Sequence, residues 1–469
     1  MRAVVVIAGM GPVGALLAAL LGSRGVDTVV VEPQETPYPK PRAAVLDTEA
    51  IRGLALVPGL GPLTEWATPV ARNGVIGADQ RPLLMIEQTG LAYGYPGLVR
   101  LDQPRLEAGL RAAALATGCV RILAGRSVTG VEQDADQAVA LLDDGQRVAG
   151  RWLVGCDGAG STVREAAGIG FAGTTYPQPW LVVDAVGGEA EGGPSVAFVA
   201  DATRPCVVMS QPGRWRWEWM LLPGEDPRTM TADEVVLGMV GAWTDPAGLE
   251  IERATVFTFH ARMADRWRAG RVLLAGDAAH ALPPFAGAGL GMGIRDAVTL
   301  AWRLGGDGTT LDGYERERRP DVRKTTALAL RIGRIVQSRN RAVMRLTRAV
   351  LRAVALLPGI ERAGERSPVV RRALPNPSVR VADGPPTLLD QVIGYRWAYI
   401  GHGCDPRGVV SGIPDDAVLL ALDHPDPEPG CLPITDLDGL LAGRSGTVTV
   451  ARPDRFLHPT IRTPAAPIG

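Results

Sequence analysis

Three parts of the sequence combine closely spaced glycines with a carboxylate. The first is GMGPVG at residues 9–14, and Glu32 follows about 20 residues later. In such a motif Gly9 permits a tight turn, Gly11 lets a pyrophosphate approach the backbone, and Gly14 lets a helix pack closely on a strand. The Glu32 carboxylate can hold ribose hydroxyls, and its charge argues against a 2′-phosphate there. We therefore predict a dinucleotide site rather than a chance turn.

The second stretch is RVLLAGDAAHALPPFAGAGLGMGIRD at residues 271–296. It begins as an apolar strand, Val272–Ala275, breaks at Asp277 and enters a loop with glycines at positions 287, 289, 291 and 293. A helix is expected from about Arg295. Asp277 can accept hydrogen bonds from sugar-like hydroxyls, and unpaired amides at the helix start offer partial positive charge. The alternative is an ordinary connection between a strand and a helix.

The third stretch is WLVGCDGAGSTVR at residues 152–164. A buried strand is expected to end at Asp157-Gly158, and the pattern Thr162-x-x-Glu165 predicts a capping box for the next helix. The order of strand, acid, glycine and helix is thus repeated. A purely structural turn would not require the acid, so we favour a ligand role for Asp157.

Three further polar residues have two interpretations each. Arg42 follows a proline-rich loop, and it either neutralises a phosphate or is a solvated surface side chain. Gln103 opens a helix as a cap or as a ligand contact, and a cap is the commoner case. His280 lies beside the glycine-rich loop, where packing or capping is favoured over proton donation. No residue is identified as a base that would deprotonate a substrate.

The chain around these motifs contains two kinds of predicted secondary structure. Val4–Ala8 and Thr28–Val31 are predicted to be buried parallel strands on either side of a helix at Val13–Ser23. From about residue 171 to residue 259, alternating runs predict antiparallel strands. In RWRWEWM, residues 214–220, the tryptophans share one face and Arg, Glu and Met share the other. One face is expected to border the ligand, and most of these side chains are expected to pack on neighbours.

The remaining third of the chain is helical and then mixed. Residues 311–356 are predicted to be helical and basic, and a solvated helix face is favoured over a membrane or nucleic-acid surface. The proline-rich segment 368–387 is predicted to be a linker. A small α/β tail follows, with candidate strands near 416–421 and 447–451 and no redox cysteine pair.

Composition limits the classes of protein that fit. The length of 469 residues suits two or three domains, and a formal net charge of −1 gives no reason to expect nucleic acid or an anionic membrane. The five cysteines are odd in number and have no CxxC spacing, and the five histidines have no metal-ligand spacing. Glycines interrupt the apolar residues near Met1, which argues against a signal peptide. We expect a cytoplasmic protein that holds no metal and has no stable membrane association.

The three stretches, with GMGPVG and Glu32 first, GCDGAGSTVR second and RVLLAGDAAHALPPFAGAGLGMGIRDAVTLAWRL third, resemble the class A FAD-dependent aromatic hydroxylases, the para-hydroxybenzoate-hydroxylase-like monooxygenases. The likeness is closer to the branch of phenol, 3-(3-hydroxyphenyl)propionate and polyketide hydroxylases. It covers about residues 1–355 and extends more faintly to LLDQVIG and VARPDR in the tail.

The resemblance implies an α/β fold with a Rossmann-like FAD-binding domain at residues 1–170 and 266–366. It also implies an inserted, mostly antiparallel β-sheet domain for substrate at 171–265, long helices, and a small thioredoxin-like C-terminal domain at 384–469 without a redox CxxC.

The resemblance also assigns residues to parts of the cofactor. The glycines of residues 9–14 would lie at the FAD pyrophosphate, Glu32 at the adenosine ribose, and Arg42 and Gln103 at the pyrophosphate and ribityl region. Asp157 and Gly158 fall in a motif linked to both FAD and NAD(P)H. Asp277 would bind the ribityl chain, and the loop that follows would line the isoalloxazine. The full set expected to bind the cofactor is Gly9, Gly11, Pro12, Val13, Gly14, Glu32, Arg42, Gln103, Asp157, Gly158, Asp277, Pro284, Gly287, Ala288, Gly289 and Leu290.

The glycine-rich loop departs from the family pattern. Family members often read GQGMN(S/T)G, whereas residues 287–293 of this chain read GAGLGMG and carry no amide side chains. Backbone amides and the helix dipole would then stabilise negative charge on the flavin. Pro284, Gly287 and Gly289 are the candidates nearest the flavin.

The implied reaction is hydroxylation of a phenolic or polyketide-like ring. NADPH or NADH, bound transiently, would reduce FAD, and O2 would form a flavin C4a-hydroperoxide that delivers the hydroxyl group. The expected quaternary state is a monomer or homodimer. One alternative is epoxidation or Baeyer–Villiger oxidation of a polycyclic natural product by the same fold. Others are a flavin halogenase, which Trp215-x-Trp217 supports only weakly, and a flavin-binding protein without catalytic activity.

Overall fold

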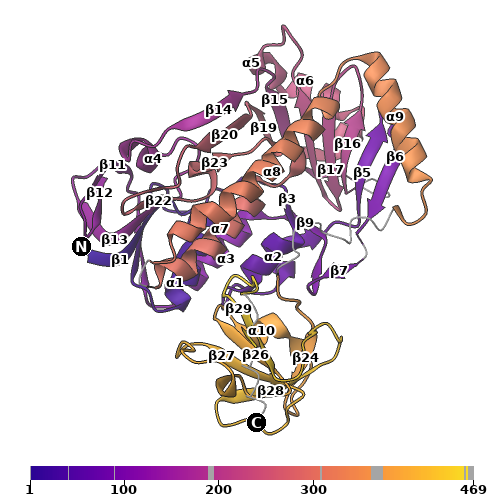
Figure 1. The fold of residues 1–469 in the computed structure, drawn as a ribbon. Coiled ribbons are helices and arrows are strands. Elements are labelled where there is room, and N and C mark those ends of the chain that lie inside the picture. The colour runs from indigo at the N-terminus through magenta and orange to yellow at the C-terminus, as the bar shows by residue number, and fades with distance from the viewer. Residues whose placement is uncertain are drawn as a thin grey trace.

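The protein is described from a computed structural model, and the expected α/β architecture is confirmed. A central, largely parallel sheet, a second sheet and a C-terminal sheet are joined by long helices (Figure 1). The structure describes residues 2–40, 42–88, 90–188, 195–306, 309–360, 373–458 and 461–462.

The central sheet brings three of its parallel strands to a common edge. β1 (Arg2–Ala8) lies between β2 (Thr28–Glu32) and β13 (Arg147–Gly155), and both neighbours run parallel to it. Continuous apolar runs are expected of such strands because helices cover both faces of a parallel sheet. The remaining strands are β10 (Val120–Ala124), β11 (Val128–Gln133), β12 (Ala138–Leu142), β21 (Arg268–Ala269) and β22 (Val272–Leu274).

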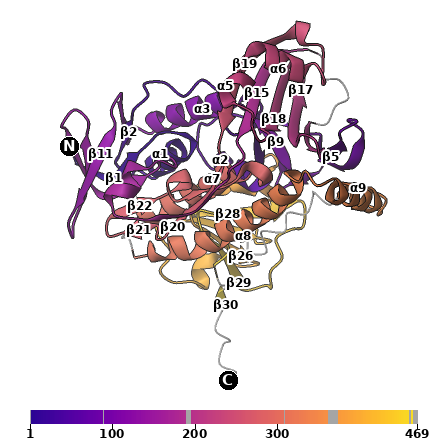
Figure 2. The same ribbon diagram turned by 90° about the horizontal axis from the view of Figure 1, so that it is seen from above.

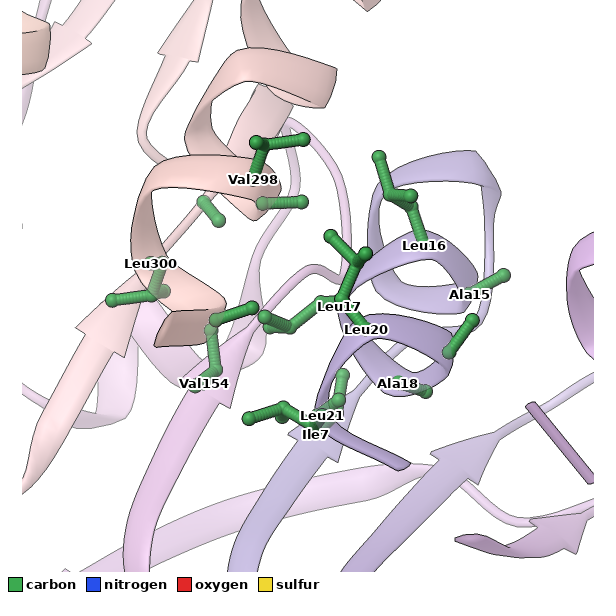
Figure 3. Close-up of a cluster of buried hydrophobic side chains, with 14 of the residues drawn as sticks. Ile7, Ala15, Leu16, Leu17, Ala18, Leu20, Leu21, Val154, Val298 and Leu300 are labelled. Carbon is green, nitrogen blue, oxygen red and sulfur yellow. The ribbon is translucent and has the colours of Figure 1, made fainter. Parts of the chain in front are cut away.

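Two helices pack against this sheet and against each other. α1 (Pro12–Ser23) starts within the first glycine motif, and α7 (Gly289–Leu304) starts within the glycine-rich stretch 287–293. In Figure 3, Leu17 extends from α1 toward the side of α7 that carries Val298. The Leu17 side chain is fully buried, which contributes about 1.5–3 kcal/mol for a leucine.

The second sheet contains a hairpin that sequence analysis did not assign to it. Its strand order is β19-β15-β18-β17-β16-β5-β6, and β5 pairs with β16 in parallel, with Asn73 opposite Val196. The expected antiparallel region is thus confirmed and extended. The strands are β5 (Arg72–Gly77), β6 (Pro82–Glu87), β15 (Trp180–Gly187), β16 (Val196–Ala200), β17 (Cys206–Gln211), β18 (Arg214–Met220) and β19 (Leu249–Phe257).

The tryptophan face of β18 packs under two short helices. Trp217 stacks on Trp215 and on Trp219, with ring centroids 5.1 and 5.9 Å apart. All three rings belong to a core that also includes side chains of α5 (Pro227–Met230) and α6 (Asp233–Val240). The tryptophans therefore pack on neighbouring side chains, as expected for most residues of this strand. The opposite face of β18 is turned toward the central sheet.

Shorter elements connect the two sheets. They are β3 (Val45–Asp47), α2 (Thr48–Ala55), β4 (Ala67–Pro69), β7 (Leu91–Ala92), β8 (Tyr95–Pro96), β9 (Leu98–Leu101), α3 (Gln103–Ala116), α4 (Thr162–Ala166), β14 (Phe171–Thr175), β20 (His260–Ala264) and β23 (His280–Ala281).

The helical segment after α7 forms two helices. α8 (Asp312–Val336) continues through Pro320 and runs across the molecule, whereas α9 (Arg341–Ala355) lies beside β5 and β6 (Figures 1 and 2). No helix among the described residues is long and apolar enough to cross a bilayer.

The C-terminal segment forms a separate sheet below α1, α2 and α7 in the view of Figure 1. The strands expected near 416–421 and 447–451 are confirmed as β27 and β29. Within the predicted linker 368–387, residues 378–381 form β24 and residue 387 begins β25, and residues 368–372 lie outside the described residues. The elements are β24 (Ser378–Val381), β25 (Thr387–Leu388), α10 (Leu389–Ile393), β26 (Ala398–His402), β27 (Val418–Leu422), β28 (Cys431–Asp436), β29 (Thr447–Ala451) and β30 (Ile461–Arg462).

A buried carboxylate joins this C-terminal sheet to the rest of the molecule. Asp390 on α10 accepts hydrogen bonds from Arg52 on α2, at 2.6 and 2.9 Å, and from Nε of Arg455 at 2.6 Å. All three side chains are at least 95% buried. Burial raises the pKa of Asp390, but attraction to Arg455 and Arg52 outweighs this and lowers it overall. Asp390 is therefore held as a carboxylate at the junction.

We expect Asp390→Ala to destabilise the docked C-terminal sheet by about 3–5 kcal/mol, because it leaves two buried guanidinium groups without their shared partner. Denaturant unfolding would measure the loss. The matched control is Asp416→Ala, which removes a 3.0 Å ion pair to Arg24 whose carboxylate is half exposed. That change should cost about 0–1 kcal/mol. Equal effects of the two substitutions would contradict the assignment.

Candidate active site

A single cavity of about 600 Å³ connects the three predicted stretches, a volume within the usual range for ligand sites. It opens where β1, β2 and β13 end and is bounded on another side by the second sheet. Fourteen of the sixteen residues predicted to bind the cofactor line it: Gly9, Gly11, Pro12, Val13, Glu32, Arg42, Gln103, Asp157, Gly158, Asp277, Pro284, Gly287, Gly289 and Leu290.

The other two predicted residues, Gly14 and Ala288, do not line the cavity. A Cβ atom on Gly14 would come within 2.0 Å of the carbonyl oxygen of Gly9, so Gly14 lets α1 begin close to the turn. Ala288 is the N-cap residue of α7 and precedes the helix. Both residues shape the cavity through the backbone.

The glycine turn at β1 is shaped for a ligand that approaches the backbone. Gly9 has a φ of +92°, and a Cβ there would lie 2.6 Å from the carbonyl oxygen of Cys156. Nothing lies within 4 Å of the Cβ position of Gly11, which faces the cavity. Gly11 is also the N-cap of α1 and supplies no side-chain hydrogen bond. The first amides of α1 therefore remain available to an anionic group.

Glu32 ends β2 at the wall of the cavity. Its Oε2 accepts a hydrogen bond from the amide of Met10 at 2.6 Å, and its Oε1 accepts one from the amide of Gln34 at 2.9 Å. Each carboxylate oxygen can accept a further bond. The glycine turn thus fixes the orientation of Glu32, which still has acceptor sites for hydroxyl groups.

Of the two interpretations of Gln103, the helix cap is wrong. Asp102 is the N-cap of α3 and accepts a bond from the amide of Arg105. Gln103 Oε1 instead accepts bonds from the amides of Arg42 and Ala43, at 3.1 and 2.8 Å. It therefore holds the loop that carries Arg42, whose exposed guanidinium stacks on Tyr38 at 4.9 Å.

Hydrogen bonds to the Asp157 carboxylate stabilise the turn after β13. Asp157 accepts hydrogen bonds from the hydroxyl of Ser161 and, at 3.0 Å, from the amide of Val163. Ser161, rather than the predicted Thr162, is the N-cap of α4. Burial raises the pKa of Asp157, and the Ser161 bond opposes that rise. Asp157 therefore organises the turn and also faces the cavity.

Asp277 differs from Asp157 because no hydrogen bond from the described residues reaches its carboxylate. It sits in a short 3-10 turn, Gly276–Ala278, directly after β22, and its side chain is open to the cavity. Burial raises its pKa, and attraction to His280 and Arg42 opposes the rise. An acceptor in this position is suited to ligand hydroxyl groups.

A buried ionic cluster supports the turn from behind. Asp296 on α7 accepts bonds from His280 Nε2 at 2.5 Å, from Arg318 Nε at 2.9 Å and from the amide of Gly276 at 3.1 Å. Burial raises the pKa of Asp296, but His280 and Arg318 outweigh it and the net pKa is lowered. His280 is fully buried and does not line the cavity, so it packs the turn.

Helix α7 begins earlier than the sequence predicted. It starts at Gly289 and not near Arg295, so residues 289–293 are helical. Gly293 serves packing, because a Cβ there would lie 2.6 Å from Val13 of α1, whereas nothing lies within 4 Å of the Cβ position of Gly289. Ala288 gives the helix no side-chain cap. The start of α7 therefore borders the cavity without a side-chain cap, as the start of α1 does.

The polar face of β18 closes the cavity and was not assigned from sequence. Arg216 and Glu218 line it, together with Met209 of β17. Arg216 bonds Asp184 at 2.6 Å and the carbonyl oxygen of Arg42 at 3.3 Å, which links the second sheet to the loop beside the first. Alternation along a strand identified the two faces of β18, but only the packing of α5 and α6 shows which one is free.

Two residues of α3 were missed although helical spacing could have found them. Glu107 and Arg111 follow Gln103 at intervals of four residues, which places all three on one helix face. Glu107 accepts a bond from Gln103 at 2.7 Å, and Arg111 donates one to the carbonyl oxygen of Met10 at 3.2 Å. Within the described residues, no group of three or more potential metal ligands was found.

Known proteins share this arrangement. Residues 2–329 match the family model described as FAD binding domain. The 3-(3-hydroxy-phenyl)propionate/3-hydroxycinnamic acid hydroxylase of Escherichia coli is 30% identical, over 97% of this chain and 91% of its own. A second enzyme of that name from Burkholderia vietnamiensis is 34% identical, over 87% of this chain and 81% of its own.

A solved structure extends the likeness to the whole fold. The flavin-dependent monooxygenase PieE, crystallised in complex with FAD and substrate, superposes with a TM-score of 0.82. The match covers 99% of this chain and 96% of PieE at 20% identity. Because the family model spans more than half of the chain, the chain belongs to the FAD-binding-domain family, as an FAD-dependent monooxygenase of the aromatic hydroxylase type.

Proposed function

We propose that this monooxygenase holds FAD along the cavity and hydroxylates a phenolic ring between the glycine-rich loop and β18, with NADH or NADPH as a transient reductant. The observation that carries the proposal is the convergence of the glycine turn, Asp277 and the loop 284–290 on one cavity. The relatives named above act on hydroxyphenyl compounds, which supports a phenolic substrate.

The cavity has the donors and acceptors that FAD requires. The amides at the start of α1 suit the pyrophosphate, and Glu32 suits the hydroxyls of the adenosine ribose. Asp277 offers an acceptor to the ribityl chain. Arg42 adds positive charge near the phosphates. These residue roles follow the family pattern and are supported by their common position at the cavity wall.

The isoalloxazine is assigned to Pro284, Gly287, Gly289 and Leu290. FAD supplies the redox and oxygen chemistry when it is bound. The chain's part is to orient the ring and to exclude water. The amides at the uncapped start of α7 would stabilise negative charge on the flavin, which replaces the amide side chains that the family loop often carries.

The division into domains is part of the same proposal. Residues 1–170 and 266–366 would bind FAD, 171–265 would cover the substrate, and 384–469 would form the thioredoxin-like unit. The hairpin β5–β6 belongs to the substrate-covering sheet by its pairing with β16. A cytoplasmic location and a monomeric or homodimeric state complete the proposal.

We expect Asp277→Ala to lose most of the bound FAD. The substitution removes an acceptor for ligand hydroxyls, and a hydrogen bond to a charged group contributes about 1.5–3 kcal/mol. The FAD content of purified protein and the dissociation constant after reconstitution would measure the effect. Asp265→Ala is the control, because Asp265 is exposed and outside the cavity. Normal FAD retention by Asp277→Ala would refute the assignment.

Glu32→Ala should weaken FAD binding by about 1–3 kcal/mol, the scale of a lost charged hydrogen bond. Because Glu32 also binds two backbone amides, the free energy of unfolding of the FAD-free protein is measured in parallel. Glu32→Gln keeps one acceptor oxygen and should weaken FAD less. A dissociation constant that stays unchanged in the alanine variant would show that the acid is not on the ribose.

A further inference from the structure

Glu218 occupies an unusual position in the middle of β18. Its side chain lines the cavity, and its cross-strand neighbours are Val182 on β15 and Val207 on β17. A carboxylate between two valines gains no packing advantage over an apolar residue, and removing its charge from water carries a cost unless a donor is present. The surrounding sheet thus gives no structural reason for an acid at this position.

The cations nearest Glu218 are directed at a different carboxylate. Arg216 lies on the same face of β18 and donates two hydrogen bonds to Asp184, at 2.6 and 3.2 Å. Arg253 of β19 donates to Asp184 at 2.8 Å. No side chain among the described residues donates a hydrogen bond to Glu218. The charge cluster is therefore centred on Asp184, and Glu218 lies at its edge.

The other side of Glu218 is apolar and aromatic. Trp180 and Met220 belong to a buried cluster with Phe285 of the glycine-rich loop, and the Trp180 and Phe285 ring centroids are 5.7 Å apart. Met209, from the same cluster, also lines the cavity. Glu218 thus stands where a polar part of the cavity wall meets a part suited to an aromatic ring.

The electrostatic surroundings of Glu218 favour its role as a hydrogen-bond acceptor. Burial raises the pKa of Glu218, attraction to Arg216 lowers it, repulsion by Asp184 raises it, and the net shift is upward. A less acidic carboxyl group is a stronger hydrogen-bond acceptor when it is ionised. Glu218 lines the cavity in which the substrate is proposed to lie.

We propose that Glu218 is a specificity-determining residue that accepts a hydrogen bond from a hydroxyl group on the substrate ring. This rests on the proposed function, because it requires a phenolic substrate in the cavity. The O–H bond stays intact and the hydroxyl donates to a carboxylate oxygen. The same carboxylate repels a substrate carboxylate and leaves a methyl ether without a partner, so the site selects ring hydroxyls at this position.

The test compares phenols with their methyl ethers on FAD-loaded protein. The probes are 3-(3-hydroxyphenyl)propionate and 2-naphthol, each beside its methyl ether, and binding is followed through the absorbance of bound flavin. For the unmodified protein we expect each phenol to bind about 10- to 100-fold more tightly than its ether, the range for a hydrogen bond to a charged group. Glu218→Leu should bring the ratio close to one, and Glu218→Gln should give an intermediate ratio.

Glu252→Gln is the matched control and should keep the unmodified ratio, because Glu252 is exposed on β19 and outside the cavity. Should Glu218→Leu fail to retain FAD, the glutamine variant decides, and an undiminished ratio there overturns the assignment. If phenols bind and stimulate NAD(P)H consumption, but the ratio of phenol to ether affinity is the same in all variants, the role of Glu218 is refuted and the proposed function is not. Phenols that neither bind nor stimulate the unmodified protein would refute the proposed function itself.

Discussion

The structure depends on the close approach of backbone to backbone where the central strands end. A Cβ on Gly9 would lie 2.6 Å from a carbonyl oxygen of the turn after β13, and one on Gly14 would lie 2.0 Å from Gly9 itself. A Cβ on Gly293 would meet Val13 at 2.6 Å. Because no side chain intervenes, α1, α7 and β13 meet at one point, and the starts of both helices border the same cavity.

Burial of ionic groups then holds the pieces in register. Asp296 ties α7 to the turn after β22 and to α8, and Asp390 ties the C-terminal sheet to α2. Asp390 is shared by two guanidinium groups, and Asp296 accepts hydrogen bonds from Arg318, His280 and the amide of Gly276, so each carboxylate is bonded to protein groups. Such clusters add little net stability compared with apolar packing, but loss of one member leaves uncompensated charge, which favours one arrangement over others.

Sequence reasoning succeeded where a local pattern fixes a local structure. The glycine turn, the acid at the end of β2 and the strand before Asp277 each follow from a few adjacent residues, and all of them reach the cavity. Sequence reasoning failed where contacts between residues far apart in the chain determine the structure. α7 starts at Gly289 although glycine has a low helix propensity, and Gly293 in its first turns lies against Val13 and Gly276, which are far away in the sequence. Likewise, β5 joins the second sheet only through β16, and the free face of β18 is identified only by the helices that cover the tryptophans.

The early start of α7 bears on the missing amide side chains of the glycine-rich loop. Glycine within a helix costs about 0.5–1 kcal/mol relative to alanine, so glycine-rich sequence is a poor helix start on its own. Here contact with α1 offsets that cost, and Ala288 offers no side chain to occupy the first amides. Those amides and the helix dipole act on the same small region of the cavity wall beside Leu290. A fixed backbone donor needs no rotamer to be ordered on binding, which supports the proposal that this loop stabilises negative charge without the side chains that the family pattern carries.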